Sequence, residues 1–330
     1  MFFENDRCLA CGTALGFEPS MFAMVAVDDA GGAGGQLTRC AGAVTAGCNW
    51  VVATDDAGQL CRSCQLTRTR PPDGDDEAHQ RFVEAESAKR RLVAQLIDLG
   101  LPITSFHEHP EGLAFDLLSS RFDEVMIGHE DGVITLDLAE ADDAYRERVR
   151  TELGEAYRTV LGHLRHEVGH YYWMVLVRDA GRVDEFRERF GDERASYGDA
   201  LAAHYGGPGP TGWDAEHVSA YATMHPWEDW AETFAHYLHL RDSLDTAAAF
   251  GLRVAQPTLA DDHEVDATTS ADEHPVDVDR VLHQWGALAV AVNALNRSMD
   301  LPDLYPFVLT DAVRAKLRVV ADLVDDGPIG

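Results

Sequence analysis

Residues 157–173 read YRTVLGHLRHEVGHYYW, the most informative stretch of the chain. Its apolar side chains recur at helical spacing around the motif His166-Glu167-Val168-Gly169-His170. Residues four apart share one face of a helix, so both imidazoles can bind one Zn²⁺ while Glu167 lies beside a water on that ion. The motif therefore predicts a helical metal site where Glu167 takes a proton from water, so that the water can attack a polarised carbonyl.

A third metal ligand has to come from another segment. The metzincin arrangement would need glycine at position 173 and histidine at position 176, where this chain has Trp173 and Leu176. That arrangement is therefore excluded. The gluzincin arrangement takes a glutamate from a later helix instead, and residues 228–236, EDWAETFAH, predict such a helix.

Glu232 is the predicted third ligand because it is central in that helix, with Glu228 and His236 one turn away on either side. Neighbours at this spacing can orient the ligands. Glu228 follows Pro226 in the first turn, where a carboxylate complements the helix dipole, and this is its predicted role.

A hydrolase also needs a hydrogen-bond donor for the oxyanion that develops during attack. Four side chains near the two helices qualify: Tyr171, Tyr172, Tyr221 and His225. We favour His225 and Tyr221 as catalytic residues because both closely precede the helix that carries Glu232.

All six cysteines lie before position 65: Cys8, Cys11, Cys40, Cys48, Cys61 and Cys64. The first two and the last two form CxxC knuckles, which present paired thiolates, so the pattern predicts a zinc ribbon. Cys40 and Cys48 either complete a site with one knuckle, leaving the other short of ligands, or are spare thiols. Disulfides are the alternative, but a chain without a secretion signal meets a reducing cytosol.

The breaker run Pro71-Pro72-Asp73-Gly74 follows the cysteine-rich part. We therefore predict a zinc-ribbon module over residues 1–70 and a catalytic domain over residues 75–330. The stretch 256–276 is acidic and rich in turn residues, which predicts a flexible surface loop within that domain.

Hydrophobic periodicity predicts a mainly helical α+β domain with a small β-sheet. A hairpin is expected over residues 125–136, with Asp131-Gly132 as its turn. Helices are expected at 75–99, 142–177 with a break near Gly154, 183–190, 194–205, 214–223, 227–249, 277–298 and 310–324.

The 330-residue chain has 27 Lys and Arg against 57 Asp and Glu, a net charge of −30. Residues 1–70 carry only −2, so the acidity belongs to the rest. This charge disfavours nucleic acid and anionic membranes as partners. The N-terminus lacks a signal-peptide pattern and no window is apolar and long enough to span a bilayer, so we expect a cytoplasmic protein.

Several runs beyond the motif resemble a bacterial family of zinc-binding metallopeptidases that carry an N-terminal zinc ribbon. They include Ala88-Lys89-Arg90-Arg91-Leu92-Val93, Ile134-Thr135-Leu136, Tyr157-Arg158 through Trp173, and His225-Pro226-Trp227-Glu228-Asp229-Trp230-Ala231-Glu232. The resemblance covers roughly residues 1–255. It implies a gluzincin-like peptidase with one catalytic Zn²⁺ and at least one structural Zn²⁺ in a rubredoxin-like ribbon.

The family pattern begins with a further CxxC knuckle that this chain does not show. Six cysteines suit one complete Zn(Cys)₄ site and an incomplete remnant. The implied partners are a peptide or protein substrate and a protein that docks on the ribbon.

Two other functions remain open from the sequence. One is a non-catalytic module with structural metal sites, which binds protein or nucleic acid through Arg62, Arg68 and Arg70 of the ribbon. Such a site would hold a fourth protein ligand in place of water. The other is a hydrolase that acts on a non-peptide amide.

Overall fold

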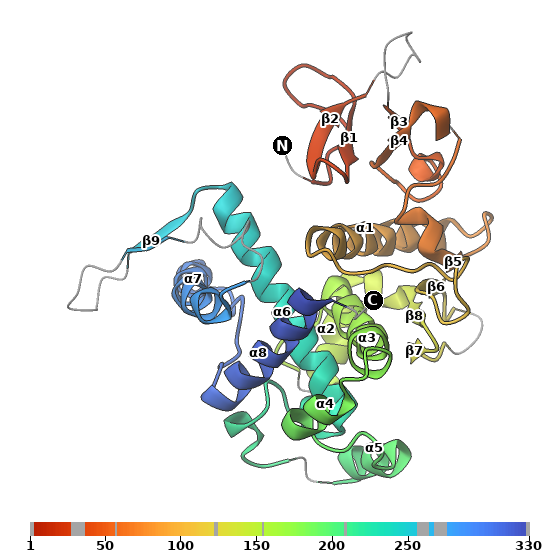
Figure 1. Cartoon of the computed structure of the whole chain (residues 1–330). Helices are drawn as coiled ribbons and strands as arrows, with labels where there is room; N and C mark the ends of the chain where they lie inside the picture. The colour runs from red at the N-terminus through yellow and green to blue at the C-terminus, as the bar shows by residue number, and fades with distance from the viewer. Residues whose placement is uncertain are drawn as a thin grey trace. The chain divides into compact units, whose positions relative to one another are not determined.

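The computed structural model describes residues 3–327 except 28–36, 57, 122–124, 154, 208–209, 256–263 and 267–275. Most of the acidic loop predicted at 256–276 thus lies outside the described residues. The chain divides into two compact units (Figure 1). The first comprises Met1–Leu153 and Arg158–Leu164, and the second comprises Gly154–Tyr157 and Arg165–Gly330.

The first unit begins with two small antiparallel hairpins. They pair β1 (Leu15–Glu18) with β2 (Ala23–Ala26), and β3 (Leu37–Arg39) with β4 (Val51–Ala53). The rings of Phe17 and Trp50 lie 5.2 Å apart between them, and Trp50 is completely buried. These aromatic side chains supply much of the small core available to this cysteine-rich part.

A four-stranded sheet follows in the same unit, in the order β5-β6-β8-β7. Its strands are β5 (Thr67–Thr69), β6 (Ala114–Leu118), β7 (Gly128–Glu130) and β8 (Val133–Asp137). The predicted hairpin is present, and both turn residues, Asp131 and Gly132, have positive φ as a two-residue turn of this kind requires. Its first strand begins at Gly128, so residues 125–127 lie outside it.

Helix α1 (Asp76–Asp98) packs against this sheet through a buried polar contact. Lys89 Nζ donates to Glu86 Oε1 at 2.6 Å and also contacts Thr67 Oγ1 of β5. The same ammonium lies 5.6 Å from the centre of the Phe115 ring on β6. One strand of this sheet, β5, lies inside the segment predicted as the zinc ribbon, residues 1–70. Helix α2 (Asp143–Leu153) completes the unit.

The second unit is helical. Its elements are α3 (Val160–Trp173, which belongs to this unit from residue 165), a π-helical turn at Met174–Arg178, α4 (Val183–Phe190), α5 (Tyr197–Gly206), α6 (Pro226–Ala249), α7 (Val278–Ser298) and α8 (Asp311–Asp326). Helices α6, α7 and α8 pack against one another (Figure 1). A two-stranded hairpin of β9 (Arg253–Ala255) and β10 (Glu264–Asp266) follows α6.

One helix prediction differs from the structure. The helical stretch predicted at 142–177 is interrupted between α2 and α3, where the sequence indicated a break. The helix predicted at 214–223, in contrast, is replaced by two short 3₁₀ turns, Trp213–Ala215 and Tyr221–Thr223. There Ser219 Oγ accepts from the Ala222 backbone N–H at 3.1 Å, a local bond that competes with a continuous helix.

The predicted fold class is confirmed: the described residues are mainly helical with small sheets. Side-chain caps mark where the long helices begin. Asp75, Asp277 and Thr310 each accept a backbone N–H in the first turn of α1, α7 and α8. Within the described residues, no helix combines the length and apolar character needed to cross a membrane.

Candidate metal centres

The two helices that carry the predicted site cross at a glycine. A Cβ atom on Gly169 of α3 would lie 3.0 Å from the Ala231 Cα on α6, so only glycine permits this approach without adjustment. Trp230 Nε1 donates to the Gly169 carbonyl oxygen at 2.8 Å and ties the helices at the same point. The HExxH turn of α3 therefore lies against the first turns of α6 (Figure 1).

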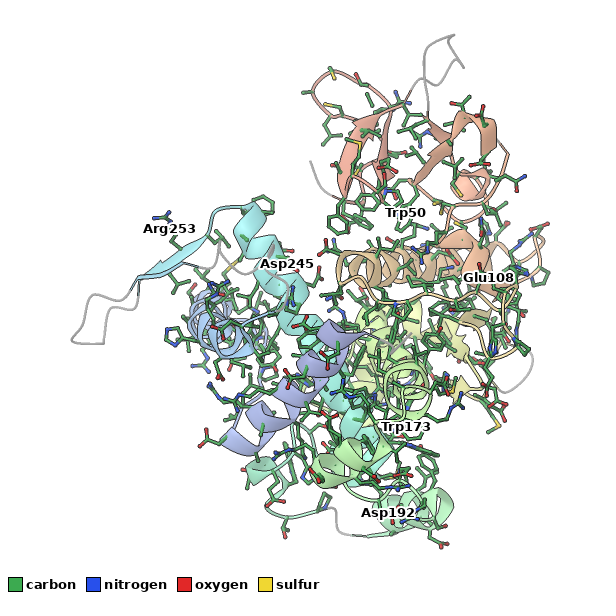
Figure 2. The ribbon with its side chains drawn as sticks, in the orientation of Figure 1. Trp50, Glu108, Trp173, Asp192, Asp245 and Arg253 are labelled. Carbon is green, nitrogen blue, oxygen red and sulfur yellow. The ribbon has the colours of Figure 1, made fainter. Side chains whose placement is uncertain are left out.

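Aromatic side chains fill the space beside this crossing. The ring of Trp173, labelled in Figure 2, packs edge-on against Phe186 at 5.8 Å and Trp227 at 5.4 Å. Tyr171 and Tyr172, two of the predicted oxyanion donors, are both buried, and the Tyr172 ring stacks on Phe234 at 5.3 Å. The structure thus places both tyrosines in the hydrophobic core.

Three side chains meet at one point of the crossing. The Glu228 Oε2 atom lies 3.0 Å from His166 Nε2 and 3.6 Å from His170 Nε2. Ligand atoms at the bond lengths of tetrahedral zinc sites, 2.0–2.2 Å, lie roughly 3.3–3.6 Å from one another. The three atoms therefore have the spacing of a metal ligand set.

The environment of Glu228 fits a metal as well. Its Oε2 atom is buried and accepts no hydrogen bond of regular geometry from the described part of the chain. Its other oxygen, Oε1, accepts a hydrogen bond from the Tyr197 hydroxyl at 2.9 Å. A buried carboxylate oxygen that faces two imidazoles calls for a cation, so the residues fit Zn²⁺.

Glu232, the predicted third ligand, lies on the opposite nitrogen of His166. Its Oε1 atom is 2.7 Å from His166 Nδ1, and its Oε2 atom accepts from the Ser219 hydroxyl at 2.6 Å. A carboxylate on the second nitrogen of a ligating histidine fixes the tautomer and the orientation of the ring. The carboxylate that faces the two Nε2 atoms is therefore that of Glu228, whereas Glu232 lies at His166 Nδ1.

The electrostatics of the site favour charged groups. Burial alone would lower the pKa of His166, but the neighbouring carboxylates of Glu228 and Glu232 raise it well above its usual value. Burial would likewise raise the pKa of Glu228, but His166 and His170 hold it well below its ordinary range. Because a metal binds neutral imidazole, metal binding here competes with protonation of His166.

Glu167, the predicted general base, lies between the two histidines on α3 and is 7% exposed. The helix places its carboxylate next to the same site, where its charge contributes to raising the pKa of Tyr197 after the effects of burial and Glu228.

The two favoured oxyanion donors have different surroundings. His225 caps α6: its Nδ1 accepts from the Trp227 backbone N–H at 3.2 Å, and its Nε2 lies 3.1 Å from the Ala195 carbonyl oxygen. Both ring nitrogens are thus engaged with backbone. The Tyr221 ring, in contrast, lies 5.9 Å from the His166 ring and borders the site.

Sequence reasoning missed Tyr197. It is the first residue of α5 and lies 31 positions before Glu228, which it contacts. The one local signal near it is Ser196, a residue type that favours the beginning of a helix, and its hydroxyl does accept from the Asp199 N–H. This signal predicts the helix but gives no indication that Tyr197 belongs to a site.

A second candidate metal centre lies in the first unit. Four buried cysteines converge there, Cys40, Cys48, Cys61 and Cys64. The Cys48 and Cys61 sulfurs are 3.7 Å apart, against roughly 3.8 Å between thiolates on tetrahedral zinc at 2.3 Å. Backbone N–H groups of Gly42 and Cys61 point at the Cys40 sulfur at 3.3 and 3.1 Å. A Cβ on Gly42 would come within 2.9 Å of the Cys64 sulfur, so the loop closes tightly around the group.

The first CxxC knuckle, Cys8 and Cys11, does not join this cluster. Its turn is closed, since the Gly12 N–H donates to the Cys8 carbonyl oxygen at 2.8 Å. Cys11 is exposed and lies 3.1 Å from the Thr13 hydroxyl. Among the described residues the knuckle has no third ligand within metal-binding distance. Cys40 and Cys48 therefore meet the second knuckle.

Comparison with known proteins agrees with both centres. The profile of the family described as "putative zinc-binding metallo-peptidase" matches residues 78–323, and that of a zinc-ribbon domain matches residues 1–75. Uncharacterized proteins of Mycobacterium bovis and Mycobacterium tuberculosis are each 48% identical over 327 residues, which is 98% of this chain and 92% of theirs. No solved structure matches the chain. The chain belongs to this family of zinc-binding metallopeptidases, with a zinc-ribbon domain at its N-terminal end.

Proposed function

We propose that this chain is a gluzincin-type peptidase, in which His166, His170 and Glu228 hold the catalytic zinc. The observation that carries the proposal is the buried Glu228 Oε2 atom, which faces the Nε2 atoms of both motif histidines at 3.0 and 3.6 Å. Zinc bound there would polarise a substrate carbonyl and acidify a water.

Glu167 is the residue that moves protons in this proposal. It follows His166 directly on α3, so its carboxylate can accept a proton from the attacking water and return it to the leaving amine. Its low exposure keeps bulk water from competing for the same proton.

Glu232, His225 and Tyr221 have supporting roles. Glu232 accepts a hydrogen bond from His166 Nδ1 and so directs Nε2 toward Glu228. His225 fixes the beginning of α6 as its N-cap and therefore the place of Glu228. Tyr221 is the remaining predicted donor with a ring beside the site, and we assign its hydroxyl to the developing oxyanion.

The four-cysteine cluster is the structural zinc site of the ribbon in this proposal. Four protein ligands leave no position for a substrate, which is the arrangement of a structural site. The ribbon surface would then bind a protein partner, and free thiols so arranged suit a reducing, cytoplasmic location. Cys8 and Cys11 would be the incomplete remnant of a second site.

The number of ligands also bears on the non-catalytic alternative. Among the described residues, the histidine–glutamate group offers three ligands where the cysteine cluster offers four. A site with three protein ligands keeps one position for water or substrate, and this favours a peptidase over a module with purely structural metals.

The test compares wild type with Glu167→Gln at equal zinc occupancy on a mixture of peptides from a cell lysate. Loss of a general base costs about 10²–10⁴-fold in rate, so new peptide ends should form with wild type and nearly vanish with the variant. Undiminished cleavage by the variant would contradict the mechanism. A fully zinc-loaded wild type that cleaves no peptide would favour the binding module or a non-peptide amide substrate.

A further inference from the structure

The Tyr197 hydroxyl forms a hydrogen bond with one of the two oxygens of the Glu228 carboxylate. It donates to Glu228 Oε1 at 2.9 Å, while Oε2 is the atom that faces His166 and His170. The two oxygens of this carboxylate therefore have separate partners: a phenol on one and the imidazole pair on the other. Tyr197 and Glu228 come from different helices, α5 and α6, so the contact depends on how those helices are joined.

The chain that leads into α5 is fixed to the beginning of α6. His225 Nε2 lies 3.1 Å from the Ala195 carbonyl oxygen, two residues before Tyr197. The Tyr197 ring packs edge-on against the His225 ring at 5.3 Å. Upstream, Pro226 Cγ lies 3.4 Å from the position a Cβ would take on Gly191, whose φ is +103°. The phenol is therefore held in place by contacts of its own ring and of the chain that precedes it.

This arrangement governs how Glu228 can bind a metal. A carboxylate can bind through one oxygen or through both, and binding through both would take up room that a catalytic site keeps for water or substrate. A hydrogen bond on Oε1 favours binding through Oε2 and restricts rotation of the carboxylate. The same bond compensates the burial of Oε1 beside an Oε2 that has no regular hydrogen bond among the described residues.

We infer that Tyr197 is a positioning residue, which holds Glu228 so that it binds zinc through Oε2 alone and thereby sets the metal affinity of the site. The inference rests on the proposed function, since it takes Glu228 as a zinc ligand. Tyr197 acts through Glu228 and needs no contact with the substrate.

The experiment measures zinc affinity in the full chain by chelator competition, for wild type, Tyr197→Phe and Tyr145→Phe. Tyr197→Phe removes only the hydroxyl that bonds Glu228. Tyr145→Phe removes a phenol oxygen from α2, a helix without any residue of the site, and is the matched control. Loss of a partner of this kind lowers metal affinity about 10–100-fold. We expect this decrease in zinc affinity only in Tyr197→Phe and only at the histidine–glutamate site. The zinc affinity of the cysteine cluster should be the same in all three proteins.

A second readout follows coordination directly. With zinc in the cysteine cluster and Co²⁺ in the other site, the visible absorption of Co²⁺ reports its geometry. We expect the Tyr197→Phe spectrum to change toward a higher coordination number while Tyr145→Phe matches wild type. Equal affinities and spectra for wild type and Tyr197→Phe would overturn this inference alone. A wild-type chain that binds zinc only at its cysteines would overturn the proposed function together with it.

Discussion

At the scale of single residues, the two lysines of the chain show how its buried charges are paired. Of the 27 Lys and Arg, only Lys89 and Lys316 are lysines, and both are buried in ion pairs. Lys316 Nζ on α8 donates to Asp229 Oδ2 at 2.6 Å and to the Glu216 carbonyl oxygen at 2.7 Å. A compact ammonium fits these places, whereas a planar guanidinium needs more room. Asp229 follows Glu228 in the chain, so this ion pair joins α8 to the turn of α6 that carries Glu228.

Replacing Lys316 by methionine should destabilise the chain. The change leaves Asp229 buried without its cation, and breaking a buried pair in this way costs about 3–5 kcal/mol. Urea unfolding measures the loss. In the double variant with Asp229→Asn the cost should be much smaller than the sum of the two single changes, and additive costs would show that the pair does not interact.

His236 predicts a pH dependence of stability. Burial, slightly opposed by Glu232, lowers its pKa to about 4, and its Nδ1 lies 2.7 Å from the Tyr305 hydroxyl. The unfolded chain takes up this proton near pH 6.5 and the folded chain only near pH 4. Stability is therefore retained above about pH 6.5 and is lost as the pH falls toward 4, by up to about 3 kcal/mol.

His236→Gln removes this titration. The difference in unfolding free energy between wild type and variant should therefore decrease by up to about 3 kcal/mol between pH 7 and pH 4. Unfolding free energies at several pH values test this. A gap that stays constant over the range would contradict the assignment.

At the scale of elements, the site is made by the crossing of α3 and α6. Gly169 permits the crossing, because a Cβ there would meet the Ala231 Cα at 3.0 Å. Backbone atoms in the middle of a helix cannot give way as a flexible side chain can. The distance between the histidine pair and Glu228 is therefore set by the absence of one methyl group.

Gly169→Ala should separate the helices by a few tenths of an ångström. We expect a cost of about 1–3 kcal/mol, as for other overpacked positions, together with weaker zinc binding at the histidine–glutamate site. Gly286→Ala in α7 is the control: it has nothing within 4 Å of a new Cβ and should stabilise by about 0.5–1 kcal/mol. Equal effects of the two substitutions on unfolding and zinc affinity would contradict the role of the crossing.

The same elements show what sequence reasoning could reach. Spacing four apart identified His166 and His170, because a helix face is a local property. The choice between Glu228 and Glu232 depends on which turn of α6 meets α3, and that depends on the contact of Gly169 with Ala231. Tyr197 reaches the site from a helix that no local pattern connects to it. Sequence periodicity could therefore not predict the contacts between helices that are distant in the chain.

At the scale of the whole molecule, the described residues include two candidate metal centres, one in each compact unit. The centre of four cysteines uses the second CxxC knuckle with Cys40 and Cys48, one of the two outcomes that the sequence left open. The charge of −30 belongs almost entirely to residues after 70. A charge of this sign opposes general binding to nucleic acid and would favour cationic peptides as substrates of the proposed peptidase.

Separate replacement of Cys48 and Cys11 tests whether only the four clustered cysteines bind zinc. Cys48→Ala removes a thiolate from the cluster and should lower the zinc content by one ion, with exposure of the neighbouring Trp50. Cys11→Ala should leave the zinc content unchanged because Cys11 lies outside the cluster. Elemental analysis and tryptophan fluorescence report both results. Zinc loss in Cys11→Ala would show that the first knuckle holds a metal of its own.

The most direct test of the account is the zinc content of Glu228→Gln beside that of Glu232→Gln, with the cysteine cluster intact in both. We predict two zinc ions per chain in wild type, one in Glu228→Gln, and two in Glu232→Gln at saturating zinc with an affinity about 10–100-fold weaker. Retention of both ions by Glu228→Gln, with loss of one by Glu232→Gln, would contradict the account and make Glu232 the ligand.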